Sequence, residues 1–353
     1  MTGENKGGRE DHINSAEGEE DVSVDAAPAT SGVRIEDLLA RRLIFVMGKG
    51  GVGKTTISIA LASAASRLKK KVLLVELGDA DSIGSFYDQT LAETPVRLSS
   101  GIWGARVDAK AELEAYVRAH IPSKFIAGRI SRSRLFDYLF EAAPGLKEVM
   151  SLGRLWRWEQ EDPRLPNAAF DLMIVDAPAT GHALSLLRLP DLLIKMIRVG
   201  PVANQLRAVQ HLLKNHQKTA IALVTLPEEL PVNETVELYQ MTSESLDMPA
   251  AAIFINCVFP DFFNRQDTRQ ILSLKTSFHN RTSAPEHLIL TCAANLIRRQ
   301  ISQKKQIRKI YAKTNCHVHI MPYFLTNDMT LKEIEKLSFE IGHNASNPPE
   351  NQF

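Results

Sequence analysis

The sequence predicts an α/β fold built on a doubly wound, mostly parallel sheet, with a helical insertion. Short, almost wholly apolar segments rich in β-branched residues recur along the chain, separated by longer helical patterns. These expected strands are residues 43–47, 72–76, 172–176, 220–225, 252–256 and 317–321. Strands that are apolar throughout are typical of a parallel sheet covered by helices on both faces. Such strands need crossover connections, and ligands bind at their carboxyl ends.

The folded part of the 353-residue chain is expected to cover residues 34–342. Residues 1–33 are rich in acidic and small side chains and hold almost no large apolar one. Such a segment cannot bury enough surface to offset the entropy of ordering, so a disordered acidic tail is predicted. Residues 343–353 are predicted to be disordered for the same reason. Residues 111–161 show only helical patterns, which predicts the helical insertion between elements of the sheet.

Composition restricts the partners and the compartment. The net charge of +1 gives no long-range attraction to nucleic acid, and no nucleic-acid partner is expected. The basic segment 298–313 is interpreted as a solvated helix face, since it lacks the aromatic partners of a nucleic-acid site. The cysteines show no paired spacing, and no apolar run is long enough to span a bilayer. A cytoplasmic protein with reduced thiols is therefore expected.

A phosphate-binding loop is predicted directly after the first strand. Residues 48–56 fit G-x-x-x-x-G-K-[ST] and run into a helical pattern. The glycines allow backbone N–H groups to point at phosphate oxygens, and the helix adds the positive end of its dipole. Lys54 would contact the β- and γ-phosphates, and Thr55 would bind Mg²⁺. The residues predicted to bind Mg·ATP are Gly48, Lys49, Gly50, Gly51, Val52, Gly53, Lys54, Thr55 and Thr56.

A second part of the site is predicted where strand 172–176 ends. Asp176 has the position of a Walker B aspartate, which holds Mg²⁺ through a water. The sequence continues Asp-Ala-Pro-Ala-Thr-Gly-His-Ala-Leu, a loop able to change conformation when the γ-phosphate leaves. Thr180, Gly181 and His182 are the predicted switch residues. His182 either transmits the signal or is a loop histidine with satisfied hydrogen bonds.

Two of these motifs resemble a known family. The loop G-K-G-G-x-G-K-T-T resembles the deviant Walker A group, which includes MinD, ParA, the nitrogenase iron protein and the arsenite-pump ATPases. The segment after Asp176 is similar to D-T-A-P-T-G-H-T-L of the ArsA and tail-anchored-protein-targeting ATPases. The resemblance implies a homodimer that closes around ATP, in which Lys49 reaches the phosphates of the partner. A solvated loop lysine is the alternative.

Weaker similarities extend over most of residues 36–340. The segments P-G-x-x-E at 144–148 and T-x-P-E at 225–228 resemble those of the same family. By that resemblance Asn256 recognises adenine, since its amide offers a donor and an acceptor. Pro322 and Phe324 are implied to lie in a loop that closes over the base.

The chain departs from the family after its second strand. The family has D-x-D-P-A-H there, with an aspartate that orients the attacking water, whereas residues 76–82 read Glu-Leu-Gly-Asp-Ala-Asp-Ser. Asp79, slightly favoured by register, and Asp81 are the two candidates for that role. Slow hydrolysis and the use of another group remain open. The family's arsenite-binding cysteines and paired-cysteine zinc site have no counterpart, and His317 and His319 lack further ligands.

The sequence therefore predicts an ATP-hydrolysing homodimeric switch that couples its nucleotide state to an unidentified partner or client protein. Transient membrane association through that partner is a further expectation. One alternative is a targeting or chaperone factor for hydrophobic helices, with the apolar stretch 184–213 as a groove, although core or dimer packing explains that stretch too. The others are a metalloid-pump subunit and a nonhydrolysing ATP-bound scaffold.

Overall fold

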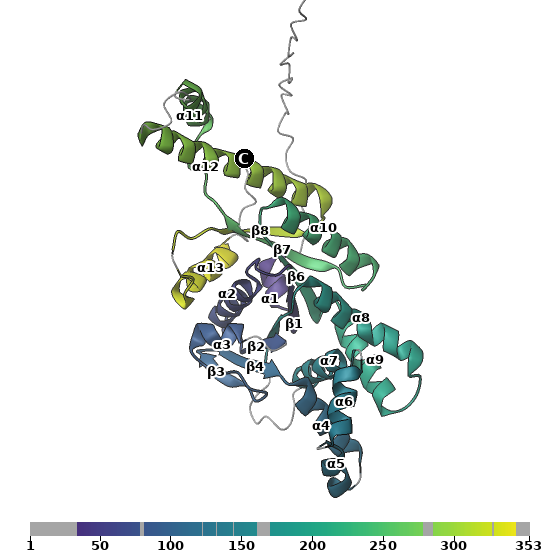
Figure 1. Ribbon diagram of the computed structural model, residues 1–353. Coiled ribbons are helices and arrows are strands. Elements are labelled where there is room, and N and C mark those ends of the chain that lie inside the picture. Colours follow the sequence, from purple (N-terminus) through teal and green to yellow (C-terminus); the bar gives the residue numbers. More distant parts are fainter. Residues whose placement is uncertain are drawn as a thin grey trace, which may run out of the picture.

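The computed structural model describes residues 34–77, 81–121, 123–131, 133–143, 145–160, 170–277, 285–326 and 328–343 (Figure 1). They form one eight-stranded sheet of order β3-β4-β2-β5-β1-β6-β7-β8. The strands are β1 (Leu43–Met47), β2 (Val72–Leu77), β3 (Val96–Ser99), β4 (Ile102–Val107), β5 (Leu172–Asp176), β6 (Thr219–Thr225), β7 (Ala250–Val258) and β8 (His317–Pro322).

Helices connect the strands and cover both faces of the sheet. They are α1 (Ile35–Leu39), α2 (Lys54–Arg67), α3 (Ser82–Tyr87), α4 (Ala109–His120), α5 (Lys124–Ser131), α6 (Arg134–Ala142), α7 (Leu146–Glu159), α8 (Thr180–Met196), α9 (Pro201–Lys214), α10 (Glu229–Glu244), α11 (Arg265–Ser277), α12 (Pro285–Lys313) and α13 (Leu331–His343). The doubly wound α/β class is thus confirmed.

All strand pairs are parallel except β3 with β4. The six predicted strands are confirmed with small shifts of their ends, but the sequence analysis missed β3 and β4. The four-residue β3 lies at the edge of the sheet, and its side chains alternate between partly buried and exposed. It therefore has no continuous apolar run. In β4 the glycine at 104 and the arginine at 106 interrupt the apolar pattern.

The core consists of two apolar layers, one on each face of the sheet. One layer joins the sheet to α1, α2 and α13, and the other joins it to α7, α8, α9, α10 and α12. Alternate residues of β1 illustrate the division, because Ile44 and Val46 belong to the first layer while Leu43, Phe45 and Met47 belong to the second. The central strands are therefore buried on both sides, which explains why they are apolar throughout.

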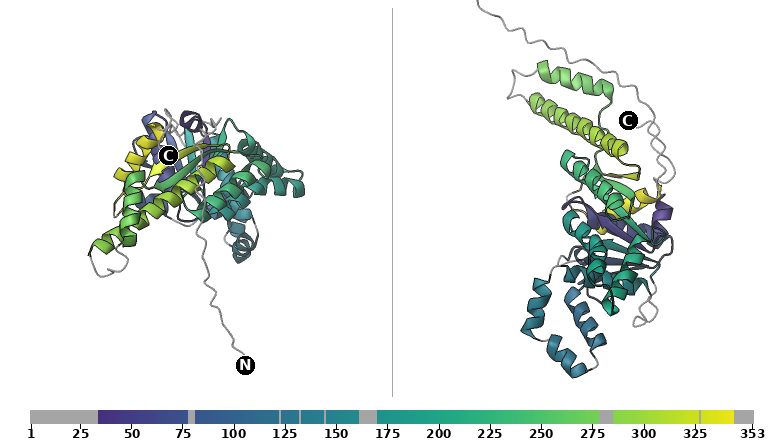
Figure 2. Two further views of the ribbon diagram at one scale, coloured as in Figure 1. Left: turned by 90° about the horizontal axis from the view of Figure 1, so that it is seen from above. Right: turned by 90° about the vertical axis from the view of Figure 1, so that its right-hand side faces the viewer.

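Two groups of helices extend from opposite ends of the sheet (Figure 1, Figure 2). At one end, α4 to α7 fill the region where the helical insertion was predicted, and buried Glu112 of α4 pairs with Arg154 of α7 at 3.1 Å. At the other end, α11 packs along α12 and has no buried residue. Among the residues that the structure describes, no helix combines the length and apolar character needed to cross a membrane.

Candidate nucleotide-binding site

The glycine-rich loop between β1 and α2 has a backbone that only glycine adopts easily. Gly51 and Gly53 have φ angles of 83° and 91°. A Cβ added to Gly48 would lie 2.3 Å from the Val224 carbonyl oxygen, and one added to Gly53 would lie 2.3 Å from Asn256 Nδ2. Around Gly50 and Gly51, by contrast, no atom comes within 4 Å of such a Cβ. The loop is therefore fixed at its two ends and open at its middle, as a phosphate cradle requires.

Lys54 lies across this loop at the start of α2. Its Nζ donates a hydrogen bond to the Lys49 carbonyl oxygen at 3.1 Å. Burial lowers the pKa of the Lys54 amine, and the nearby Asp176 carboxylate opposes that change. The ammonium group is thus held at the loop with a neutral carbonyl as its hydrogen-bond partner, so a phosphate oxygen would be a better one.

Thr55 and Asp176 meet at the carboxyl end of the sheet. Thr55 Oγ1 donates to Asp176 Oδ2 at 2.6 Å, and Ser58 Oγ lies 3.4 Å from the other carboxylate oxygen. The pKa of Asp176 is raised to about 6, mainly because the carboxylate is buried. The negative charge of Glu76 also acts to raise this pKa, whereas Thr55, Lys54 and Ser58 act to lower it. A buried carboxylate next to a hydroxyl oxygen supplies the oxygen donors that Mg²⁺ prefers. These residues therefore fit a magnesium ion.

Lys49 has a partner within its own chain. Its Nζ lies 2.7 Å from Glu234 Oε1 on α10, and both side chains are partly exposed. Any movement of Lys49 toward another group has to break this ion pair.

Asn256 supports the phosphate loop from β7. Its Nδ2 donates to the Val52 carbonyl oxygen at 3.0 Å, and the side chain is buried. Pro322 ends β8, and Phe324 follows it, partly buried against the core layer that contains α2. The structure therefore joins Asn256 to the loop, while Pro322 and Phe324 lie three strands away from β1. The adenine-binding role of all three stays a prediction.

The segment after Asp176 differs from the expected loop. The loop ends at Ala179, and α8 begins at Thr180, so Gly181 and His182 lie in the first turn of a helix and are exposed. The correction has a simple cause: Ala183, Leu186 and Leu187 are buried at helical spacing, so the helix begins ahead of them. The roles of Thr180, Gly181 and His182 as switch residues are untested predictions.

Of the two aspartates predicted to orient the attacking water, the structure describes only one. Asp79 lies outside the described residues. Asp81 immediately precedes α3, and its Oδ1 lies 2.6 Å from Arg106 Nη2 of β4. Sequence analysis missed Arg106 and also missed Glu76, a carboxylate that is 2% exposed at the end of β2. Glu76 pairs in register with Asp176, and its signal in the sequence was a single charged residue near the end of an otherwise apolar strand.

No other metal site is found in the described parts of the chain. They contain no group of three or more His, Cys, Asp or Glu side chains placed to bind a metal ion. His317 and His319 do share a strand face, with ring centroids 4.5 Å apart. His319 is 1% exposed and stacks on Phe254. This pair is part of the packing of the sheet.

The strand–glycine loop–helix unit, with Asp176 on the adjacent strand, defines a P-loop nucleotide-binding protein. Comparison with known sequences gives the family. Residues 41–200 and 196–281 match the family described as "Anion-transporting ATPase". The chain therefore belongs to this family of ATPases, the arsenite-pump type, as the motifs predicted.

Relatives in bacteria and eukaryotes carry the same general name. The chain is 32% identical to "ATPase BagA" of Mycobacterium tuberculosis over 232 residues, which cover 64% of this chain and 68% of that protein. It is 30% identical to "ATPase asna-1" of Caenorhabditis elegans over 181 residues, covering 46% and 51% respectively. With "ATPase ASNA1 homolog 2" of Paramecium tetraurelia it shares 24% identity over 300 residues, covering 79% and 86%.

Proposed function

We propose that this chain binds and hydrolyses Mg·ATP and acts as a homodimeric switch for a protein partner. The observation that carries the proposal is the contact between Thr55 and Asp176 beside an open glycine loop. It supports the proposal because these two oxygen donors and the open loop lie together at the carboxyl end of the sheet, where parallel α/β folds bind their ligands.

In the proposed reaction, the loop amides and Lys54 hold the β- and γ-phosphates. A water oxygen bonds to the γ-phosphorus as the bond from that phosphorus to the β–γ bridging oxygen breaks, which yields ADP and inorganic phosphate. Thr55 and Asp176 would hold a magnesium ion, which would supply positive charge to neutralise the phosphates. Of the two carboxylates proposed to orient the attacking water, Asp81 is the one that the structure describes.

The dimeric part of the proposal concerns Lys49. A lysine in the first turn of the loop could leave Glu234 and contact the phosphates bound by a second copy, as the family resemblance implies. Since Glu234 lies on α10, that exchange would couple nucleotide state to the position of a helix. The partner that reads this change is unidentified.

Calorimetry with Mg·ATP and a phosphate-release assay test the function. We expect the wild-type chain to bind and turn over ATP, Lys54→Ala to lose both, and Lys49→Ala to lose turnover and ATP-dependent dimerisation. Absence of binding by the wild-type chain would contradict the proposal. Tight binding without turnover would favour the scaffold instead.

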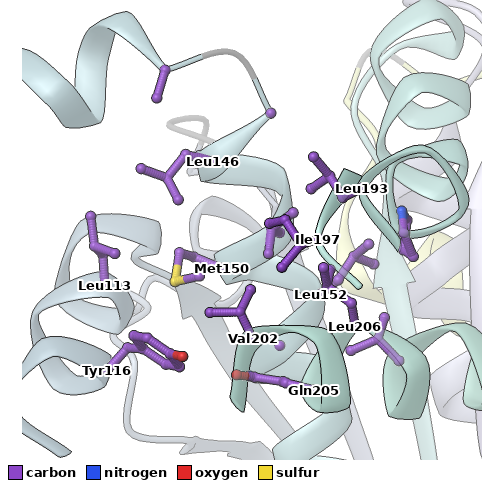
Figure 3. A pocket seen from close by; sticks show the side chains of 16 residues that line it. Leu113, Tyr116, Leu146, Met150, Leu152, Leu193, Ile197, Val202, Gln205 and Leu206 are labelled. Atoms are coloured by element: carbon purple, nitrogen blue, oxygen red, sulfur yellow. The ribbon is translucent and has the colours of Figure 1, made fainter. Parts of the chain in front are cut away.

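A second candidate function is supported by an apolar cavity among α4, α7, α8 and α9 (Figure 3). Its volume is about 330 Å³, and its labelled aliphatic side chains point toward a common space. The labelled lining residues are Leu113, Tyr116, Leu146, Met150, Leu152, Leu193, Ile197, Val202, Gln205 and Leu206. Apolar side chains that neighbour lining residues in the sequence are exposed and extend the surface: Leu192, Met196 and Val199.

Such a surface fits one apolar face of a client helix. This supports the targeting or chaperone alternative, in which the nucleotide state controls access to the cavity. Photo-crosslinking of a hydrophobic helix to residues lining the cavity, with and without ATP, tests it. Crosslinks that fall elsewhere would remove this candidate. The metalloid-pump alternative has no support from the described residues, which hold no group of three or more His, Cys, Asp or Glu side chains placed around one ion. Cys257 lies on β7, Cys292 on α12, and Cys316 just before β8.

A further inference from the structure

Charged side chains form a row across three neighbouring strands beside the phosphate loop. Arg106 of β4 pairs in register with Glu76 of β2, which pairs in register with Asp176 of β5. Residues in register on parallel strands lie about 4.8 Å apart and point to the same face of the sheet. Here that face carries α2 and α3, which places the row next to Lys54 and Thr55.

Glu76 is the centre of this row, and three donors hold it. Its Oε1 accepts the backbone N–H groups of Ser82 at 2.6 Å and Ile83 at 3.3 Å, the first two residues of α3. Its Oε2 lies 3.4 Å from Arg106 Nη2. A carboxylate bonded in this way is a fixed acceptor rather than a free base. Glu76 therefore ties the start of α3 to the end of β2.

Arg106 extends the row to Asp81. Its Nη2 reaches both Asp81 Oδ1, at 2.6 Å, and the Glu76 carboxylate. Asp81 occupies the N-cap position of α3, yet its side chain makes no capping hydrogen bond to that helix. The Asp81 carboxylate is instead held by Arg106 and keeps 43% of its side-chain surface exposed. The Asp81 carboxylate is thus oriented by Arg106 on one side and is open to solvent on the other.

We propose that Glu76 and Arg106 are positioning residues, which hold the Asp81 carboxylate at the same edge of the sheet as Asp176, where it orients the water attacking the γ-phosphate. Glu76 sets the place of α3, and Arg106 sets the direction of the Asp81 side chain. This inference rests on the ATPase function proposed above.

The same contacts allow an opposite reading, in which Arg106 keeps Asp81 away from the water. Two features favour positioning. Glu76 is buried and bound on both oxygens, so the row is built into the sheet rather than added at a loop tip. Asp81 also remains partly exposed, as a group that contacts a substrate water must. Removal of Arg106 separates the readings, because it slows turnover in one and accelerates it in the other.

The experiment measures kcat and KM for Mg·ATP in the 353-residue chain. Arg106→Ala and Asp81→Asn should each lower kcat by about tenfold to a hundredfold with KM changed less than about twofold, because water orientation matters only during the reaction. Arg106→Lys should recover part of the rate, since an ammonium still pairs with Asp81. The double variant Arg106→Ala with Asp81→Asn should be no slower than the slower single variant.

Several results would overturn the inference. They are a kcat unchanged or raised in Arg106→Ala, multiplicative effects in the double variant, and a rise in KM without loss of kcat. If Arg106→Ala does not fold, the exposed substitution Asp81→Asn alone decides, because full turnover in it excludes the water-orienting role. If the wild-type chain itself shows neither ATP binding nor turnover, the proposed function fails first, and that result is distinct. Glu114→Gln, at an exposed surface ion pair, is the matched control and should keep wild-type kinetics.

Discussion

The phosphate-loop edge of the sheet and the helical region around the apolar cavity differ in how their side chains are held. At the loop edge, polar groups contact one another at short distances, as Thr55 does with Asp176 and Arg106 does with Asp81. Around the cavity, apolar side chains such as Met196 and Val199 are exposed on α8 and after it. Fixed polar contacts suit a reaction with one geometry, whereas aliphatic surface without directional bonds suits helices of varied sequence.

The largest effect is expected at Lys54. Lys54→Ala removes the cation held over the loop, so ATP affinity and turnover should each fall by about a hundredfold or more. Isothermal titration and phosphate release measure the two. Lys332→Ala, an exposed lysine on α13, is the control and should behave as the wild type. A functional Lys54→Ala variant would show that the loop edge is not the site.

The next effect is expected at Asp176, where function and stability should separate. Asp176→Asn removes the magnesium carboxylate and should reduce Mg²⁺-dependent turnover by about a hundredfold. Because burial disfavours the charged Asp176 and raises its pKa to about 6, the amide should leave thermal stability without nucleotide equal or higher. Thermal melting measured with and without Mg·ATP tests both expectations. A large loss of stability in the nucleotide-free protein would contradict this account.

His319 tests whether the packing of the sheet keeps a buried imidazole neutral. Burial lowers the pKa of His319 to about 3, below the ordinary value of 6.5. Between these values the unfolded chain binds a proton that the folded chain does not, so stability should fall as pH drops below about 6.5. By pH 5 the loss reaches at most about 2 kcal/mol. His319→Phe, matched in shape to the stacked ring, should flatten this part of the pH profile in denaturant titrations.

The apolar side of the comparison is tested at the end of α8. Met196→Ser with Val199→Ser, both highly exposed, should reduce binding of a hydrophobic helix by about tenfold and leave ATP turnover within about twofold. Fluorescence anisotropy with a labelled helix measures the affinity. An exposed pair elsewhere, Leu325→Ser with Leu68→Ser, provides the control. Equal losses in both pairs would mean that the helix binds nonspecifically.

The smallest effect is expected at Glu234. Glu234→Gln weakens the partly exposed ion pair with Lys49, which contributes at most about 1 kcal/mol. If this pair restrains Lys49, dimer formation with a nonhydrolysable ATP analogue should strengthen by about twofold to fivefold. Analytical ultracentrifugation can detect this change. Weaker dimers would indicate that Glu234 itself contributes to the dimer contact.

Residues whose function follows from local sequence were the easiest to predict. The loop 48–56 and Asp176 are recognised from contiguous motifs, and six strands from continuous apolar runs. Arg106 and Glu76 were harder, because each acquires its role from a neighbour 25 to 100 residues away that only the strand order brings close. The start of α8 at Thr180 depended on which apolar residues further along the helix become buried.

The central place of β1 in the sheet has a consequence for how a bound nucleotide is sensed. The loop after β1 and the first turn of α2 contact β5 on one flank, through Thr55 and Asp176. On the other flank the loop contacts β7 through Asn256 and α10 through Glu234. Any change in the shape of this short turn has to be accommodated on both flanks together. One short peptide segment is thus in direct contact with elements on both sides of the central strand.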